Sequence, residues 1–256
     1  MNASLGDHFE QECDEETYPF VVSKVRAVTE GDDLVAVLAE LMNRNKSDPA
    51  VTADLLRAAR WEVALAPLRA GRISVRRGDF GEVLAAESAE AIDGLIVPIR
   101  KLRYQIDPNQ TLPGNDVVAL VVSDVGEIDD LEFIESKYRT KPGLDIAVEA
   151  HEQLTDDRNA AYATTINFIA HRLRELDPEL YELFIEFLSA RGKRDARHTV
   201  ALCFDESEWD ERILERLGEL DEHLPTLWVR TFPLNEAVAL IDEVYERLKW
   251  DVVDDD

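Results

Sequence analysis

The stretch from Gly114 to Tyr138 constrains the fold of this chain most strongly, because it holds two apolar runs on either side of a short polar segment. Val117 to Val122 is a continuous run of β-branched and aliphatic residues, and Leu131 to Ile134 is a second run, interrupted by one glutamate. The polar segment SDVGEIDD between them contains one glycine, which is typical of a hairpin loop. Glutamate and lysine at 135 and 137 then continue the second strand where buried residues are expected. The sequence therefore predicts a β-hairpin that carries charge at one end.

The pairing of this hairpin brings charged side chains together. If Val122 lies opposite Leu131, then Asp116 lies opposite Lys137, and alternation along the strand puts Glu135 on the same face. Two nearby carboxylates repel each other unless a cation lies between them, and Mg²⁺ prefers oxygen ligands of this kind. A lysine beside them can orient a water or help to deprotonate it. These residues therefore match what the hydrolysis of a phosphodiester requires.

The order of these residues resembles the PD-(D/E)xK motif of nucleases with the restriction-endonuclease-like fold. Asp116 is followed, 19 positions later, by Glu135-x-Lys137, and Glu82 within RRGDFGEVLAAESAE matches the glutamate that this family carries on an upstream helix. Asn115 stands where the superfamily often has proline. More narrowly, the succession GDFGE, ND and ESKYRT resembles the HamA nuclease family of Hachiman antiphage defence systems.

The resemblance implies a fold, an activity and a partner. The expected fold is α/β, with a restriction-endonuclease-like mixed central sheet flanked by helices. The expected activity is that of a metal-dependent nuclease that hydrolyses DNA with Mg²⁺ (or Mn²⁺). Asp116, Glu135 and the main-chain carbonyl of Ser136 would bind the metal, Lys137 would orient or activate the water, and Glu82 would assist. The expected partner is a helicase subunit, HamB-like, that restrains the nuclease until foreign or damaged DNA is sensed.

Simpler interpretations of the same residues stay open at this point. Glu135 and Lys137 could form an ordinary surface pair on an exposed edge strand. Glu82 lies three residues after Asp79, which is the spacing of a capping box in which Asp79 would be the N-cap.

The net charge of −26 is unusual for a protein that binds nucleic acid, because phosphate contacts favour basic surfaces. The scarcity of lysine and the abundance of aspartate resemble a salt-adapted protein. Positions 57–103, however, hold nine basic and six acidic residues. We predict nucleic-acid contacts from the basic side chains of this window and from those that follow the hairpin. These residues are Arg76, Arg77, Arg100, Lys101, Arg103, Arg139 and Lys141. The alternative that the charge favours is an acidic, non-catalytic interaction protein or DNA mimic.

The remaining composition predicts the compartment and the domain organisation. No apolar run approaches the roughly 20 residues that cross a bilayer, and the acidic N-terminus lacks the features of a signal peptide. Cys13 and Cys203 form no disulfide framework, so a cytoplasmic location without membrane contact is expected. Residues 1–17 are expected to be a disordered acidic tail, residues 18–250 a single nuclease domain, and residues 251–256 an acidic tail.

Hydrophobic periodicity predicts the other elements. Strands are expected at 18–29, 198–204 and 226–232, and Pro98 argues against a central strand within 91–106. Helices are expected at 32–42, 52–66, from 79 onward, and at 144–154, 158–176, 178–190, 210–220 and 235–248. The alternation of strand and helix toward the C-terminus predicts further strands on one mixed sheet.

Overall fold

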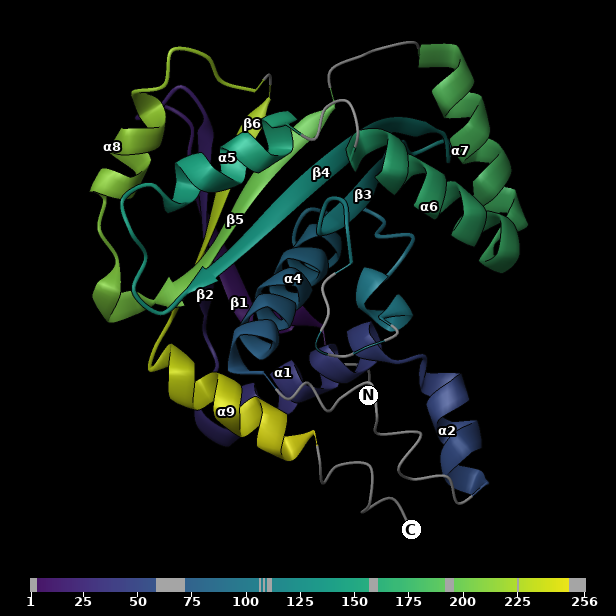
Figure 1. Cartoon of the computed structure of the whole chain (residues 1–256), viewed down its shortest axis with the longest axis horizontal. Helices are drawn as coiled ribbons and strands as arrows, with labels where there is room; N and C mark the ends of the chain where they lie inside the picture. Colours follow the sequence, from purple (N-terminus) through teal and green to yellow (C-terminus); the bar gives the residue numbers. More distant parts are fainter. Residues whose placement is uncertain are drawn as a thin grey trace.

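A computed structural model describes residues 4–58, 72–105, 107, 109, 112–156, 161–191, 196–224 and 226–248. Six strands form one mixed sheet in the order β1-β2-β6-β5-β4-β3 (Figure 1). The strands are β1 (Phe9–Asp14), β2 (Val21–Ala27), β3 (Val117–Val122), β4 (Ile128–Arg139), β5 (Arg197–Asp205) and β6 (Leu227–Leu234). The pairs β2–β6, β6–β5 and β5–β4 are parallel, whereas the outer pairs β1–β2 and β3–β4 are antiparallel.

Helices cover both faces of this sheet (Figure 1). One apolar core lies under α1 (Gly31–Lys46), α4 (Ile73–Ala91) and α9 (Ala237–Arg247). The other lies under α5 (Ile146–Asp156), α6 (Ala161–Leu176), α7 (Pro178–Arg191) and α8 (Arg212–Gly218). The described elements also include α2 (Pro49–Arg57) and the short helices η1 (Leu5–Asp7), η3 (Lys101–Tyr104) and η4 (Glu206–Glu208). The predicted α/β fold, a mixed central sheet flanked by helices, is confirmed.

Local sequence explains why these elements form. Strand β5 is buried along almost its whole length, as expected for a central parallel strand with helices on both faces. Helix α1 buries Leu34, Leu38 and Leu41, which recur at helical spacing and form one apolar stripe. The predicted strands near 18–29, 198–204 and 226–232 are confirmed, as are the helices predicted from 144 to 248. Residues 92–100 form an isolated bridge, Ile96 to Leu120, and no strand, in agreement with the position of Pro98.

The predicted disorder of residues 1–17 is wrong for the part of that segment that the structure describes. Strand β1 pairs with β2 from Phe9 opposite Ala27 to Asp14 opposite Val22. The physical reason is that Leu5 and Phe9, despite their acidic surroundings, are buried in the core beneath α1 and α4.

The predicted hairpin register is wrong by two residues. Leu120, and not Val122, lies opposite Leu131, because β4 begins earlier than expected, at Ile128. The turn is correspondingly tight, and the Ser123 amide donates to the Glu127 carbonyl at 2.8 Å. A shift of two residues keeps every side chain on its face of the sheet, whereas a shift of one would reverse them all.

Two helix boundaries also differ from expectation. Helix α2 ends at Arg57, and the rest of the predicted 52–66 helix lies largely outside the described residues. Helix α4 begins at Ile73, before the predicted start at Asp79.

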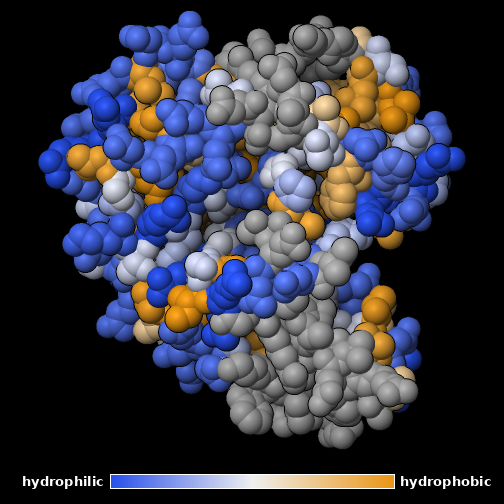
Figure 2. Space-filling model, in the orientation of Figure 1, coloured by the Kyte–Doolittle hydropathy of each residue, from blue (hydrophilic) through white to orange (hydrophobic). Residues whose placement is uncertain are grey.

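No helix among the described residues is both long and apolar enough to cross a bilayer. The face shown in Figure 2 is mainly hydrophilic, with apolar patches toward α6 and α7 at its upper right.

Candidate active site

A cleft of about 530 Å³ opens where β3 begins and β4 continues past it. Its walls come from the first half of α4, the segment around η3, the turn before β3, the second half of β4, and α5. The polar and glycine residues that line it include Asp79, Glu82, Lys101, Gln105, Gly114, Asp116, Glu135, Ser136, Lys137, Arg139 and Gln153. All four predicted catalytic residues therefore line one cleft.

Unequal strand lengths create this cleft. The β3–β4 ladder ends with Val117 opposite Ile134, while β4 continues to pair with β5 on its other side. The free edge of β4 is met by Asp116, whose Oδ2 accepts a hydrogen bond from the Ser136 amide at 2.9 Å. The amide and carbonyl of one residue in a strand point to the same side, so the Ser136 carbonyl also faces the Asp116 side. This geometry supports the prediction that Asp116 and the Ser136 carbonyl could share a ligand.

Glu135 and Lys137 form the other half of the site. Lys137 Nζ lies 2.5 Å from Glu135 Oε1 and also donates to Gln153 Oε1 on α5. The Glu135 and Lys137 side chains are only 8% and 15% exposed. Because both side chains are this well buried in the cleft, the interpretation as an ordinary surface pair on an exposed strand is wrong, even though β3 does not pair with β4 at these residues.

Glu82 reaches the cleft from α4, which packs on the opposite face of the sheet from α5. The neighbouring Gly81 allows this approach, because a Cβ there would lie 2.8 Å from Ser136 Oγ on β4. The capping-box alternative is wrong, since α4 starts at Ile73 and Asp79 lies within the helix. Asp79 is buried and forms an ion pair with the buried Lys46.

Burial and the Asp116 carboxylate raise the pKa of two other carboxyl groups of the cleft. Burial and the nearby Asp116 carboxylate raise the pKa of Glu135 to about 7, although Lys137 opposes the shift. Burial and Asp116 likewise raise the pKa of Glu82 well above its usual range, against the effect of Lys101. A cation would relieve this destabilisation of the ionised Glu82 and Glu135 carboxylates.

The donor set fits Mg²⁺. Within the described residues, no group of three or more His, Cys, Asp or Glu side chains is arranged to hold a metal ion by itself. Mg²⁺ does not need such a group, because it usually binds one or two carboxylates and keeps several waters. Asp116, Glu135 and the Ser136 carbonyl supply hard oxygen ligands of this kind, and Glu82 lines the same cleft.

Five of the seven predicted nucleic-acid-binding residues form a first group, whose side chains line the cleft, lie over an aromatic ring or form an ion pair at the surface. Lys101 and Arg139 line the cleft. Arg77 lies over the ring of Tyr138 at 5.8 Å, and Arg76 lies over the ring of Tyr245 at 5.3 Å. Lys141 is 80% exposed and pairs with Glu208 at 3.0 Å.

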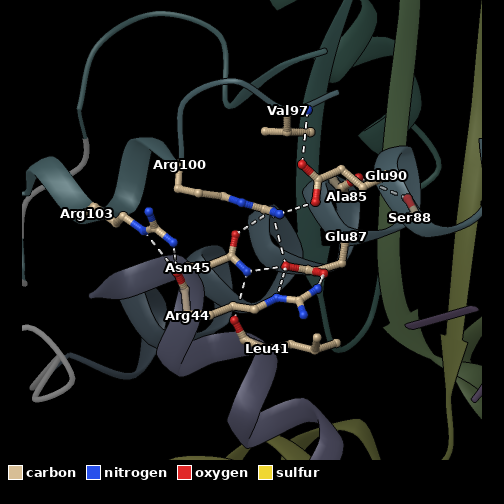
Figure 3. Close-up of polar contacts among 10 residues, drawn as sticks. All are labelled: Leu41, Arg44, Asn45, Ala85, Glu87, Ser88, Glu90, Val97, Arg100 and Arg103. Atoms are coloured by element: carbon tan, nitrogen blue, oxygen red, sulfur yellow. Dashed lines mark hydrogen bonds and ion pairs between the residues drawn. The ribbon is translucent and has the colours of Figure 1, made fainter. Parts of the chain in front are cut away.

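Arg100 and Arg103 form the second group, because their side chains contact α1 and α4 and do not line the cleft (Figure 3). The Arg100 side chain is 11% exposed and pairs with Glu87 and Glu90 of α4. Arg103 donates to the Arg44 carbonyl on α1 at 2.6 and 2.9 Å. The structure thus does not bring these two side chains into the cleft.

Sequence reasoning missed Gln153, Asp79 and Lys46. Gln153 lies on α5, and nothing in its local sequence predicts the contact with Lys137. Lys46 carries a signal that could have found it, since it falls four residues after Met42 on the apolar stripe of α1. A lysine on such a stripe needs a buried acidic partner, which proves to be Asp79.

Comparison with known proteins assigns a family to this chain. No curated protein matches it in sequence. The sequence model of the HamA family, by contrast, matches residues 34–248. This match covers most of the chain and includes all the residues that line the cleft. The chain therefore belongs to the HamA family of the Hachiman antiphage defence system.

Proposed function

We propose that this protein is a metal-dependent nuclease of the PD-(D/E)xK type that hydrolyses DNA phosphodiester bonds. The observation that carries the proposal is the convergence of Glu82, Asp116, Glu135 and Lys137 on one cleft at the start of β3. Membership of a family of antiphage defence proteins is compatible with this activity.

Each protein group in the cleft has its own role in the proposed reaction. Asp116, Glu135 and the Ser136 carbonyl would hold Mg²⁺, with Glu82 as an additional acidic group. When bound, Mg²⁺ would polarise the phosphate and make water a better nucleophile. Lys137 Nζ, held between Glu135 and Gln153, would orient the attacking water and place a positive charge near the developing negative charge. Arg139 at the rim could contact the DNA backbone.

The first test is cleavage of supercoiled, linear and single-stranded DNA by the purified protein, with Mg²⁺, with Mn²⁺ and with EDTA. We expect metal-dependent cleavage that falls by about 100-fold or more in Lys137→Ala and Glu135→Gln, because each removes a group that acts on the reacting atoms. Lys24→Ala is the matched control for Lys137→Ala, since Lys24 lies on β2, away from the cleft, and its loss changes the net charge equally.

A helicase subunit is the proposed partner, and it would restrain the nuclease. Co-expression and copurification with the product of the neighbouring gene tests the association. If neither the isolated chain nor the complex cuts any of the three substrates with metal, the nuclease proposal is wrong. A metal-dependent rise in melting temperature that is lost in Glu135→Ala would separate a nuclease site from the alternative of an acidic DNA mimic.

A further inference from the structure

Lys101, at the start of η3, contacts the chain directly before strand β3. Its Nζ donates to the Gly114 and Asn115 carbonyls, both at 3.0 Å. Hydrogen bonds from a charged donor are stronger than those between neutral groups. Lys101 therefore fixes the two peptide units that precede Asp116.

The same turn is fixed from two other sides. The Asn115 amide donates to Thr165 Oγ1 on α6 at 3.2 Å. Asp116 Oδ2 accepts from the Ser136 amide on β4. Gly114 has φ +89°, a left-handed backbone conformation that glycine adopts readily. The turn therefore has one defined conformation, and these contacts hold it. Lys101 is the link between this turn and the segment around η3.

That segment is itself held rigidly to the helix that carries Glu82 (Figure 3). Arg100 Nη1 lies 2.8 Å from Asn45 Oδ1 and 3.1 Å from Glu87 Oε1. The Val97 amide donates to Glu90 Oε1 at 3.1 Å. Arg100 thus anchors the residue that follows it, Lys101, to both α1 and α4.

We propose that Lys101 is a positioning residue that holds the Asp116 carboxylate at the metal site by clamping the turn at 114–115. This inference rests on the proposed function, because it assumes that Asp116 binds the metal. It also changes the interpretation of Lys101, which the sequence predicted as a phosphate contact.

Lys101 has two effects on a metal ion, and they have opposite signs. Its positive charge lies near the cleft carboxylates, so charge alone would weaken Mg²⁺ binding, and removing it would strengthen binding. Its hydrogen bonds place Asp116, so removing them would weaken binding. The proposal requires the second effect to dominate, and the sign of the change in affinity therefore decides between the two.

The first experiment measures amide hydrogen exchange at Ser136 in the metal-free protein by NMR. In Lys101→Met we expect exchange to become faster by about tenfold or more, because the Asp116 acceptor is released. Amides of β4 that pair with β5 should not change. Lys101→Arg, which keeps a charged donor, should stay close to the parent, and Lys24→Met controls for the loss of charge. Unchanged exchange at Ser136 in Lys101→Met would overturn the assignment.

The second experiment measures Mg²⁺ affinity by calorimetry in the parent, Lys101→Met and Asp116→Asn. We expect parental binding that weakens by about tenfold in Lys101→Met. A stronger affinity in Lys101→Met would show that the lysine acts through its charge alone and would overturn the assignment while leaving the nuclease proposal intact. Absence of binding in the parent would contradict the proposed metal site itself, and with it this inference.

Discussion

At the scale of single residues, Glu135 links the site to the stability of the whole fold. Its pKa is about 7 in the folded protein, against 4.5 as the ordinary value. Between these values the folded state binds more protons than the unfolded state, so stability falls as the pH rises through this window. The site therefore destabilises the metal-free protein at neutral pH, which is common where function sets the choice of residues.

We expect the free energy of unfolding of the metal-free parent to fall between pH 4.5 and 8 by roughly 3 kcal/mol more than that of Glu135→Gln. Urea unfolding in EDTA across this range measures the difference. Identical pH profiles for the parent and the variant would show that Glu135 does not cause the effect. Mg²⁺ should restore more stability at pH 8 than at pH 5.5, because the ion binds the deprotonated carboxylate.

Gln153 makes a second prediction at this scale. Its Oε1 accepts a hydrogen bond from Lys137 Nζ. We expect Gln153→Ala to lower kcat of DNA cleavage by about tenfold with little change in KM, because Lys137 would lose one of its two acceptors and its fixed orientation. Glu152→Ala is the control, because Glu152 is an exposed neighbour on the same helix that does not line the cleft. A change in KM alone would assign Gln153 to substrate binding instead.

At the scale of elements, the turn before β3 tests how backbone conformation supports the site. At Gly114, φ is +89° and an added Cβ would lie 2.5 Å from Thr165 Oγ1. At Gly94, φ is also positive, +68°, but nothing lies within 4 Å of the added Cβ. We expect Gly94→Ala to cost about 1 kcal/mol of stability and Gly114→Ala about 3 kcal/mol, because the second adds a steric collision to the same backbone strain. Thermal unfolding of both variants measures this, and equal costs would contradict the collision.

The buried ion pairs between α1, α4 and the segment before η3 give another prediction. Glu87 is fully buried and accepts from Arg44 Nε at 2.9 Å and from Asn45 Nδ2 at 2.5 Å. We expect Glu87→Gln to destabilise the protein by about 3 kcal/mol, because the partly buried Arg44 and Arg100 would lose their counter-charge. Asp54→Asn breaks an exposed pair with Arg57 and should cost less than about 0.5 kcal/mol. Urea unfolding that gives equal losses would contradict the importance of burial.

The sequence predicted most elements and also that Asp116, Glu135 and Lys137 lie together, because both depend on short-range pattern. The alternation of side chains along a strand was enough to bring Asp116, Glu135 and Lys137 together, even with the hairpin register wrong by two. Contacts that depend on tertiary packing were not predicted from the sequence. Arg100 and Lys101 are neighbours in the sequence, yet one packs into a buried cluster and the other lines the cleft. Their orientation depends on where α4 lies, which local pattern does not determine.

At the scale of the whole molecule, the net charge of −26 is the dominant feature. Repulsion among so many carboxylates opposes the compact state, and salt screens it. We expect the melting temperature to rise by about 5 °C between 0.05 and 1 M NaCl. A variant with Glu10, Glu12 and Glu15 changed to Gln, all exposed, should respond less. A melting temperature independent of salt would show that the carboxylates do not repel one another appreciably in the folded state.

The cluster of Arg44, Asn45, Glu87 and Arg100 also bears on how chains of this kind diverge over time. Loss of any one charged member strands another charge in the interior, whereas joint replacement by apolar residues of similar volume costs little. Proteins in which only one or two of these residues are replaced would be less stable than proteins with the full cluster or with a fully apolar replacement. Selection therefore disfavours replacement one residue at a time. We therefore expect related proteins either to keep all four residues or to have replaced all four.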